Sequence, residues 1–124
     1  MSGPTVRTLV PMAQVRSVPA SIAFYTRLGF GIANTFTPAG EAEPSWASLT
    51  SDRAEIMVTR AEKGGTADPR AVLFYAYCDD VAAFRERLVG DGIAVGPIAY
   101  PFYAPRGEFR IEDPDGYVVM VTHT

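Results

Sequence analysis

The chain has 124 residues, of which 48% are hydrophobic and 20% charged, a composition typical of an ordinary globular protein and not of a disordered or fibrous one. A formal net charge of -3 without a basic cluster argues against a nucleic-acid partner. The sequence shows neither an apolar run of about 18 residues nor a signal-peptide pattern at its start, so we expect a cytoplasmic location and no membrane partner.

The length favours a single domain, 1–124, because half-chains of about 60 residues would each be marginally stable alone. The lone cysteine, Cys78, excludes an intrachain disulfide. The only histidine, His123, lies at the chain end. We therefore interpret Cys78 as a small buried strand residue and not as a nucleophile.

The first half is predicted to contain one helix and four strands. Residues 7–15 read as a strand in which Pro11 lacks an N–H, which indicates a sheet edge or a bulge. Ser17 is a plausible N-cap, and Gly29 ends the helix. A loop rich in Pro and Gly follows at 37–44. The other strands are expected over residues 30–36, 45–49 and 54–59.

The second half is predicted to follow the same plan. Asp79 or Asp80 caps its helix, whose Val81, Phe84 and Leu88 face inward, and Gly92 ends it. Residues 99–107 form a long loop rich in aromatic residues and proline. Its strands are expected over residues 71–78, 93–98, 108–112 and 117–122.

The two halves align at a constant offset of 63 residues. This offset places Ala13 on Ala76 and Met57 on Met120. We infer a tandem repeat of one motif, strand–helix–three strands. Its parts are a first module at 5–60, a linker at 61–69 and a second module at 70–124. One helix per module covers one sheet face, and the opposite faces can curve around a ligand.

Two segments carry a resemblance to a known family. They are Pro19–Tyr25 before Leu28-Gly29-Phe30, and Asp113-Pro114-Asp115-Gly116. The repeated unit with these segments resembles the vicinal oxygen chelate superfamily, which includes glyoxalases, extradiol dioxygenases, fosfomycin-resistance enzymes and bleomycin-resistance proteins. The resemblance implies an α+β fold of two tandem βαβββ modules forming a curved mixed sheet. It also implies a homodimer with ligand sites shared between subunits.

Metal-dependent members of that superfamily carry ligands on the first and last strands of each module. The corresponding positions here are Val10, Met57, Leu73 and Met120. None offers an oxygen or an imidazole nitrogen, and a thioether is a poor ligand for hard divalent ions. We therefore expect no metal site and no cofactor.

Strand alternation and the loop aromatics predict the lining of a binding groove. Its residues are Met12, Gln14, Phe36, Trp46, Glu55, Met57, Tyr75, Tyr77, Phe102, Tyr103, Gly107 and Met120. Alternatives stay open for several of them. The strand tyrosines and Glu55 also fit ordinary strand positions, and Gly107 an ordinary turn. The loop aromatics fit a partner subunit as well as a ligand.

These features favour a non-catalytic protein that sequesters an aromatic antibiotic or other natural product, similar to bleomycin-resistance proteins. The alternative is a glyoxalase-type lyase or isomerase, or a dioxygenase-like enzyme, with an atypical or absent metal site. In the lyase, Glu55 would act as the base, provided that it is buried. A third possibility is an accessory protein of a biosynthetic cluster.

Overall fold

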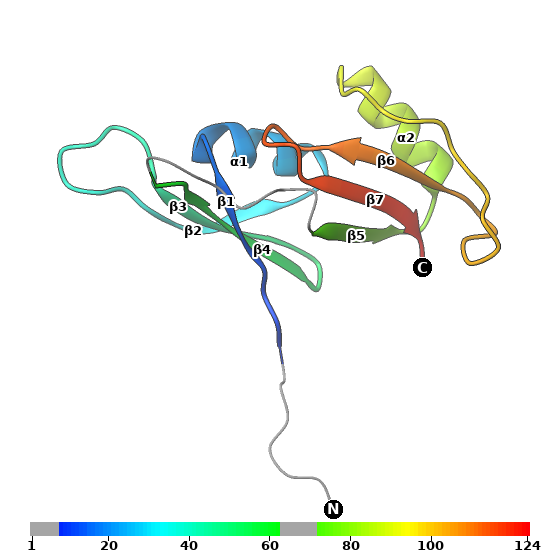
Figure 1. Cartoon of the computed structure of the whole chain (residues 1–124), viewed down its shortest axis with the longest axis horizontal. Coiled ribbons are helices and arrows are strands. Elements are labelled where there is room, and N and C mark those ends of the chain that lie inside the picture. The colour runs from blue at the N-terminus through cyan, green and yellow to red at the C-terminus, as the bar shows by residue number, and fades with distance from the viewer. Residues whose placement is uncertain (1–7, 63–71) are drawn as a thin grey trace, which may run out of the picture. The chain divides into compact units, whose positions relative to one another are not determined.

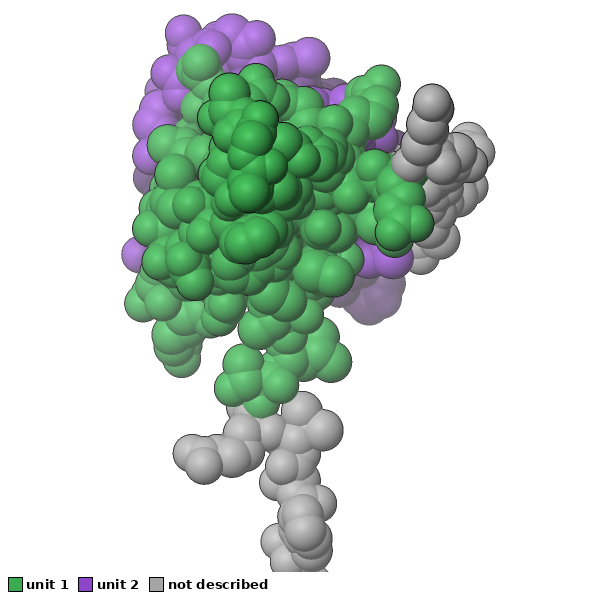
Figure 2. All heavy atoms as spheres, turned by 90° about the vertical axis from the view of Figure 1, so that its left-hand side faces the viewer, with its two compact units in different colours: residues 1–65 green, residues 66–124 purple. Residues whose placement is uncertain are grey.

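The computed structural model describes residues 8–62 and 72–124. The chain divides into two compact units, residues 1–65 and 66–124 (Figure 2). Most of the predicted linker, from residue 63 onward, lies outside the described residues, as do the first residues of both predicted modules. Within the described ranges, no helix has the length and apolar character needed to cross a bilayer.

The first unit contains one helix and a four-stranded sheet (Figure 1). The sheet has the order β1-β4-β3-β2, with β1 parallel to β4 and the other neighbours antiparallel. The edge position of β1 agrees with the prediction from Pro11, which immediately precedes this strand. The elements are β1 (Met12–Val15), α1 (Val18–Arg27), β2 (Gly31–Phe36), β3 (Trp46–Ser51) and β4 (Ala54–Arg60).

Helix α1 begins and ends where the sequence predicts. The hydroxyl of Ser17 accepts a hydrogen bond from the backbone N–H of Ala20 at 3.2 Å, which satisfies one free donor of the first turn. Gly29 follows the last turn with φ of 103°, a conformation that glycine adopts without steric cost. The helix packs on β2, β3 and β4. Fully buried side chains of the helix and of the strands beneath it include Val18 of α1 and Val15, Leu49 and Val58 of the sheet.

The second unit contains one helix and a three-stranded sheet, in the order β5-β7-β6 (Figure 1). The carboxylate of Asp80 caps α2 by accepting a hydrogen bond from the N–H of Ala83 at 3.0 Å. Helix α2 packs on β6 and β7, with Val81 and Leu88 buried and Phe84 half-buried. The elements are β5 (Leu73–Cys78), α2 (Val81–Gly90), β6 (Glu108–Glu112) and β7 (Val118–His123).

The turn between β6 and β7 is organised by Asp113, which is buried. Its carboxylate accepts hydrogen bonds from the N–H groups of Asp115 and Tyr117, both at 2.9 Å. Gly116 takes a positive φ of 89°, and its N–H donates to the carbonyl of Asp113. Hydrogen bonds to Asp113 therefore hold the motif Asp113-Pro114-Asp115-Gly116 in a turn, and this turn connects the two strands of the final hairpin.

The strand predicted over residues 93–98 is not formed as a regular strand. Its segment lies along β6 through a hydrogen bond from the N–H of Gly96 to the carbonyl of Arg110, and an isolated bridge joins Ala99 to Glu108. Pro97 has no N–H to donate, which interrupts the ladder between these contacts. The second unit therefore has three strands and an irregular fourth segment.

Strand pairing confirms the internal repeat. Met12 pairs with Met57 in the first unit, and Tyr75, 63 residues after Met12, pairs with Met120 in the second. The helices begin at Val18 and Val81, at the same offset. The predicted α+β class is confirmed, as two related units of the kind expected for tandem βαβββ modules.

Candidate functional site

In the first unit, the predicted site residues share the sheet face opposite α1. Residues that pair directly across strands project to the same side, and side chains alternate along each strand. Met12 pairs with Met57, Trp46 pairs with both Thr59 and Phe36, and the alternate residues Ala13 and Val58 are buried. The residues on this face are Met12, Gln14, Phe36, Trp46, Glu55 and Met57.

Glu55 does not have the environment that a buried general base needs. Its side chain is exposed, and its Oε2 accepts a hydrogen bond from the hydroxyl of Ser48 at 2.9 Å. The burial on which the lyase hypothesis depends is therefore not found in this chain.

In the second unit, the corresponding sheet face is aromatic. Tyr75 and Tyr77 project from β5, are 46% and 63% exposed, and have ring centroids 6.4 Å apart. They pair with Met120 and Thr122 on the central strand β7. The structure thus brings Tyr75, Tyr77 and Met120 together on one uncovered face.

The loop before β6 contributes two more of the predicted aromatic residues. Phe102 is 95% exposed and contacts Tyr103 edge to face, with ring centroids 5.4 Å apart. The Tyr103 hydroxyl donates a hydrogen bond to Oε2 of Glu108 at 3.1 Å. This bond, followed by desolvation and the charge of Glu108, raises the pKa of Tyr103, to which Tyr75 contributes a smaller part.

Gly107 has a structural reason to be glycine. Its φ is 102°, and a Cβ built on it would lie 2.6 Å from Cγ2 of Ile98 and 3.2 Å from the ring of Tyr100. The residue is also buried. The close approach that a glycine permits at this position is therefore to the protein's own 98–100 segment.

Sequence reasoning missed Glu108. This residue is only 6% exposed, although β6 ends beside the exposed loop aromatics. Glu108 pairs with Thr122, which places its side chain on the face that carries Tyr77. The fixed offset from the first half aligns Trp46 with Phe109, one residue away, so the repeat gave no signal for Glu108.

Cys78 occupies a structural position. It lies on the opposite face from Tyr77, is half-buried, and pairs with His123 across the parallel strands. Desolvation raises the pKa of its thiol, which keeps the thiol protonated at neutral pH. This agrees with a strand residue and not with a nucleophile.

The positions that bear ligands in metal-dependent relatives offer a poor donor set. Met57 and Met120 lie at equivalent places on β4 and β7, and Val10 and Leu73 are aliphatic. Thioether and aliphatic side chains do not fit a hard divalent ion. In the described parts of the chain, no three His, Cys, Asp or Glu side chains group closely enough to hold a metal ion.

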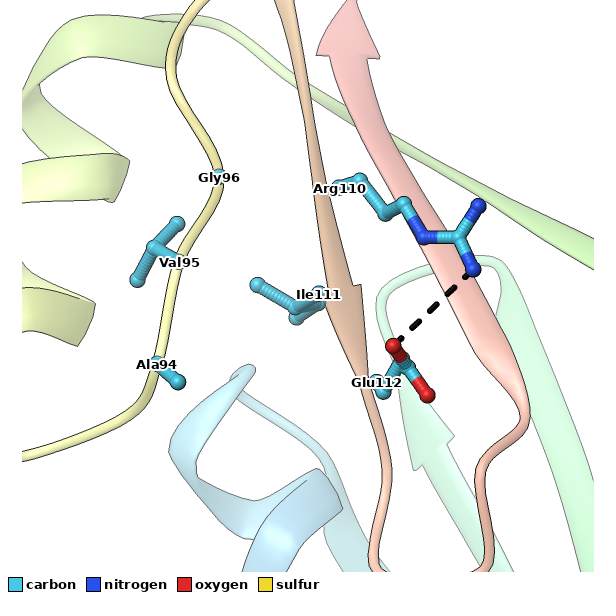
Figure 3. Close-up of a pocket in the computed structure, with 6 residues that line it drawn as sticks. All are labelled: Ala94, Val95, Gly96, Arg110, Ile111 and Glu112. Carbon is cyan, nitrogen blue, oxygen red and sulfur yellow. Dashed lines mark ion pairs between the residues drawn. The ribbon is translucent and has the colours of Figure 1, made fainter.

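A hollow of about 330 Å³ lies elsewhere in the second unit, between the 94–96 segment and β6. Figure 3 shows Ile111 extending from β6 toward the 94–96 segment, while Arg110 and Glu112 project from the other side of β6, where they form an ion pair of 3.9 Å. None of the predicted site residues lines this hollow. It is a surface depression beside the interrupted fourth strand.

Comparisons with known proteins identify the family. No curated protein sequence matches the chain. Similar solved structures include a bleomycin resistance determinant encoded on the transposon Tn5 (22% identity, 96% of this chain and 98% of that chain, TM-score 0.71). TnmS3, an antibiotic binding protein from Streptomyces sp. CB03234, is also similar (18%, 98% and 98%, TM-score 0.77). So is a lactoylglutathione lyase from Agrobacterium tumefaciens (20%, 98% and 96%, TM-score 0.68).

At these identities the structural likeness shows the fold alone, and it includes both a binding protein and an enzyme. The sequence profile of the Glyoxalase/Bleomycin resistance protein/Dioxygenase superfamily matches residues 8–121, nearly the whole chain. The chain belongs to the Glyoxalase/Bleomycin resistance protein/Dioxygenase superfamily.

Proposed function

We propose that this protein binds and sequesters an aromatic antibiotic or other natural product, without catalysis. The observation that carries the proposal is the aromatic face of the second unit, where Tyr75 and Tyr77 lie uncovered on the sheet and Tyr103 is tied to the same face through Glu108. Large apolar rings held in fixed positions bind flat aromatic molecules by stacking and area burial.

The first unit supports the proposal with a second uncovered face. Trp46 and Phe36 are adjacent on β3 and β2, and Met12 and Met57 are adjacent on β1 and β4. Methionine side chains adapt to irregular apolar surfaces, while the rings provide rigid contact area. These methionine and aromatic residues suit capture of a ligand better than they suit polar or metal-assisted catalysis.

The mechanism would be stoichiometric capture in the cytoplasm, with the bound molecule kept from its target. We further propose that the protein works as a homodimer whose ligand sites are shared between subunits. Each aromatic contact would add roughly 0.5 to 1.5 kcal/mol beyond area burial. Several such contacts give useful affinity without a metal ion.

A thermal-shift screen with bleomycin and other DNA-damaging or aromatic natural products tests the proposal. A ligand that binds only the folded protein raises the melting temperature as its concentration rises. We expect at least one aromatic compound to do so, and titration calorimetry to show tight binding at a fixed stoichiometry. A screen in which every compound leaves the melting temperature unchanged would contradict the proposal.

Two substitutions place the site. Tyr75→Ala and Trp46→Ala each remove a ring from an uncovered face, so we expect weaker binding of the screened ligand and little change in fold. Val89→Ala is the control, because Val89 is an exposed apolar residue on α2, away from both faces. Unchanged affinity in both ring variants would remove the site assignment.

A further inference from the structure

The uncovered face of the second unit contains one acidic group whose hydrogen bonding is incomplete. Glu108 is 6% exposed, and its Oε2 accepts the hydrogen bond from Tyr103. Its other oxygen, Oε1, is buried and has no hydrogen-bond partner among the described residues. A buried polar atom without a partner is destabilising, so its retention needs an explanation.

Within its own row across the sheet, Glu108 has one aromatic and one uncharged polar neighbour. The row across the sheet through this residue consists of Tyr77, Thr122 and Glu108, in register on β5, β7 and β6. Thr122 is itself buried, and its hydroxyl donates to the carbonyl of Gly107 at 3.4 Å. Glu108 is therefore the hydrogen-bond acceptor at one end of this row, and the ring of Tyr77 lies at the other end.

The nearby arginines are engaged elsewhere. Arg106 donates to the His123 ring and to the carbonyl oxygen of Thr124. Arg110, two residues along β6, lies 3.9 Å from the carboxylate of Glu112. Among the described residues, the hydrogen bond to the Glu108 carboxylate comes from the phenol of Tyr103 and not from a cation, which leaves Oε1 suited to a donor from outside.

We propose that Glu108, oriented by Tyr103, is the anchor that selects ligands carrying a protonated amine beside an aromatic ring. This deepens the proposed function and rests on it, because it names the chemical class that the aromatic face prefers. The ring of such a ligand lies against Tyr75 and Tyr77, and its donor reaches Oε1 of Glu108. A charge-assisted hydrogen bond in this poorly solvated position is stronger than a neutral one.

Two probes with the same ring and different charge test the proposal. Tryptamine carries a protonated amine at neutral pH, whereas N-acetyltryptamine keeps the indole ring and an amide N–H but has no charge. We expect the unaltered protein to bind tryptamine about tenfold more tightly in an NMR titration, as a charge-assisted bond implies. Equal affinities, or no binding of either probe, would overturn the role assigned to Glu108.

Three variants test whether the Glu108 carboxylate itself causes the preference for tryptamine. Glu108→Gln should remove most of the preference for tryptamine and leave binding of N-acetyltryptamine nearly unchanged. Tyr103→Phe keeps the charge, so the preference should persist. Glu112→Gln is the matched control, because Glu112 is an exposed carboxylate on the same strand and face. A preference that survives Glu108→Gln, or that is lost equally in Glu112→Gln, would contradict the proposal.

The two proposals fail in distinguishable ways. If an aromatic natural product raises the melting temperature but the tryptamine preference is absent, only the role of Glu108 is wrong. If no aromatic compound binds, the proposed function is wrong as well. Should Glu108→Gln not fold, equal affinities of the two probes for the unaltered protein would still overturn the role of Glu108.

Discussion

The two halves of the chain share a backbone plan but differ in what they present on their uncovered faces. The parallel strand pairs keep the same register, so Gln14 pairs with Thr59 as Tyr77 pairs with Thr122. In the first half the edge strand β1 carries Met12 and Gln14, whereas in the second half β5 carries two tyrosines. The two halves thus share a scaffold and differ in the side chains on the sheet face opposite the helix.

A one-residue shift creates the second difference. In the first half Trp46 is opposite Thr59, and in the second half Glu108 is opposite Thr122. The offset between Trp46 and Glu108 is 62 residues and not 63, because the Asp113 turn is longer than the two-residue turn between Ser51 and Ala54. A tryptophan in one half is therefore replaced by a buried carboxylate in the other.

The largest loss of stability is expected at a core position where the two halves carry side chains of different size. Phe109 and Ala47 occupy equivalent places opposite Val121 and Val58, and both are buried. Phe109→Ala should lower the free energy of unfolding by about 3–5 kcal/mol, because it leaves a large cavity. Urea denaturation followed by circular dichroism measures this. A loss no larger than that of the exposed variant Val89→Ala would show that Phe109 is not a core residue.

Two glycines with positive φ differ in the space available to an added side chain. Gly107→Ala places a Cβ against Ile98, whereas Gly40→Ala, at φ of 83°, meets nothing within 4 Å. Backbone strain should lower the free energy of unfolding of both variants by roughly 1–3 kcal/mol, and only Gly107→Ala adds a steric clash. Thermal denaturation should show the larger loss for Gly107→Ala. Equal losses would mean that the 98–100 segment moves aside without cost.

The two helix caps should contribute equally to stability. Ser17 and Asp80 each accept one hydrogen bond from a first-turn N–H, at matching places in the repeat. Ser17→Ala and Asp80→Ala should each cost about 0.5–2 kcal/mol of unfolding free energy. Chemical denaturation of both variants measures the two losses side by side. A marked inequality would show that one helix depends on its cap far more than the other.

The smallest effect concerns pH. The pKa of Tyr103 is raised in the folded protein, mainly by its hydrogen bond to Glu108, so the folded state holds this proton more tightly than the unfolded state. This contribution to stability is present below the ordinary tyrosine pKa of about 10 and is lost as pH rises through the raised value. Phenolate absorbance should show a late-titrating component that is missing in Tyr103→Phe and shifted to lower pH in Glu108→Gln. A titration that is the same in Glu108→Gln as in the unaltered protein would contradict the hydrogen bond.

Much of the scaffold could be predicted from the sequence, because local signals and the repeat agreed. Ser17 and Gly29 mark one helix, Asp80 and Gly92 mark the other, and strand alternation placed Met12 and Tyr75 on uncovered faces. Such signals are local in the chain or periodic.

Other features could not be predicted because they depend on pairing between distant residues. The register of β6 on β7 places Glu108, and not Phe109, on the sheet face that carries Tyr77. Pro97 interrupted a strand that hydrophobic pattern alone favoured. From the sequence, Gly107 fits both an approach to a ligand and an ordinary turn. The clash that excludes a side chain there comes from Ile98, which the sequence alone does not place beside it.

The most direct measurement is a two-dimensional amide NMR titration of the unaltered protein with bleomycin, or with the aromatic natural product that stabilises it most. We expect the largest amide chemical-shift changes at residues 75–77, 107–108 and 120–122 of the second half, together with a change at the Trp46 indole of the first. Shifts confined to α2 and the 94–96 segment would contradict it, as would the absence of any saturable shift.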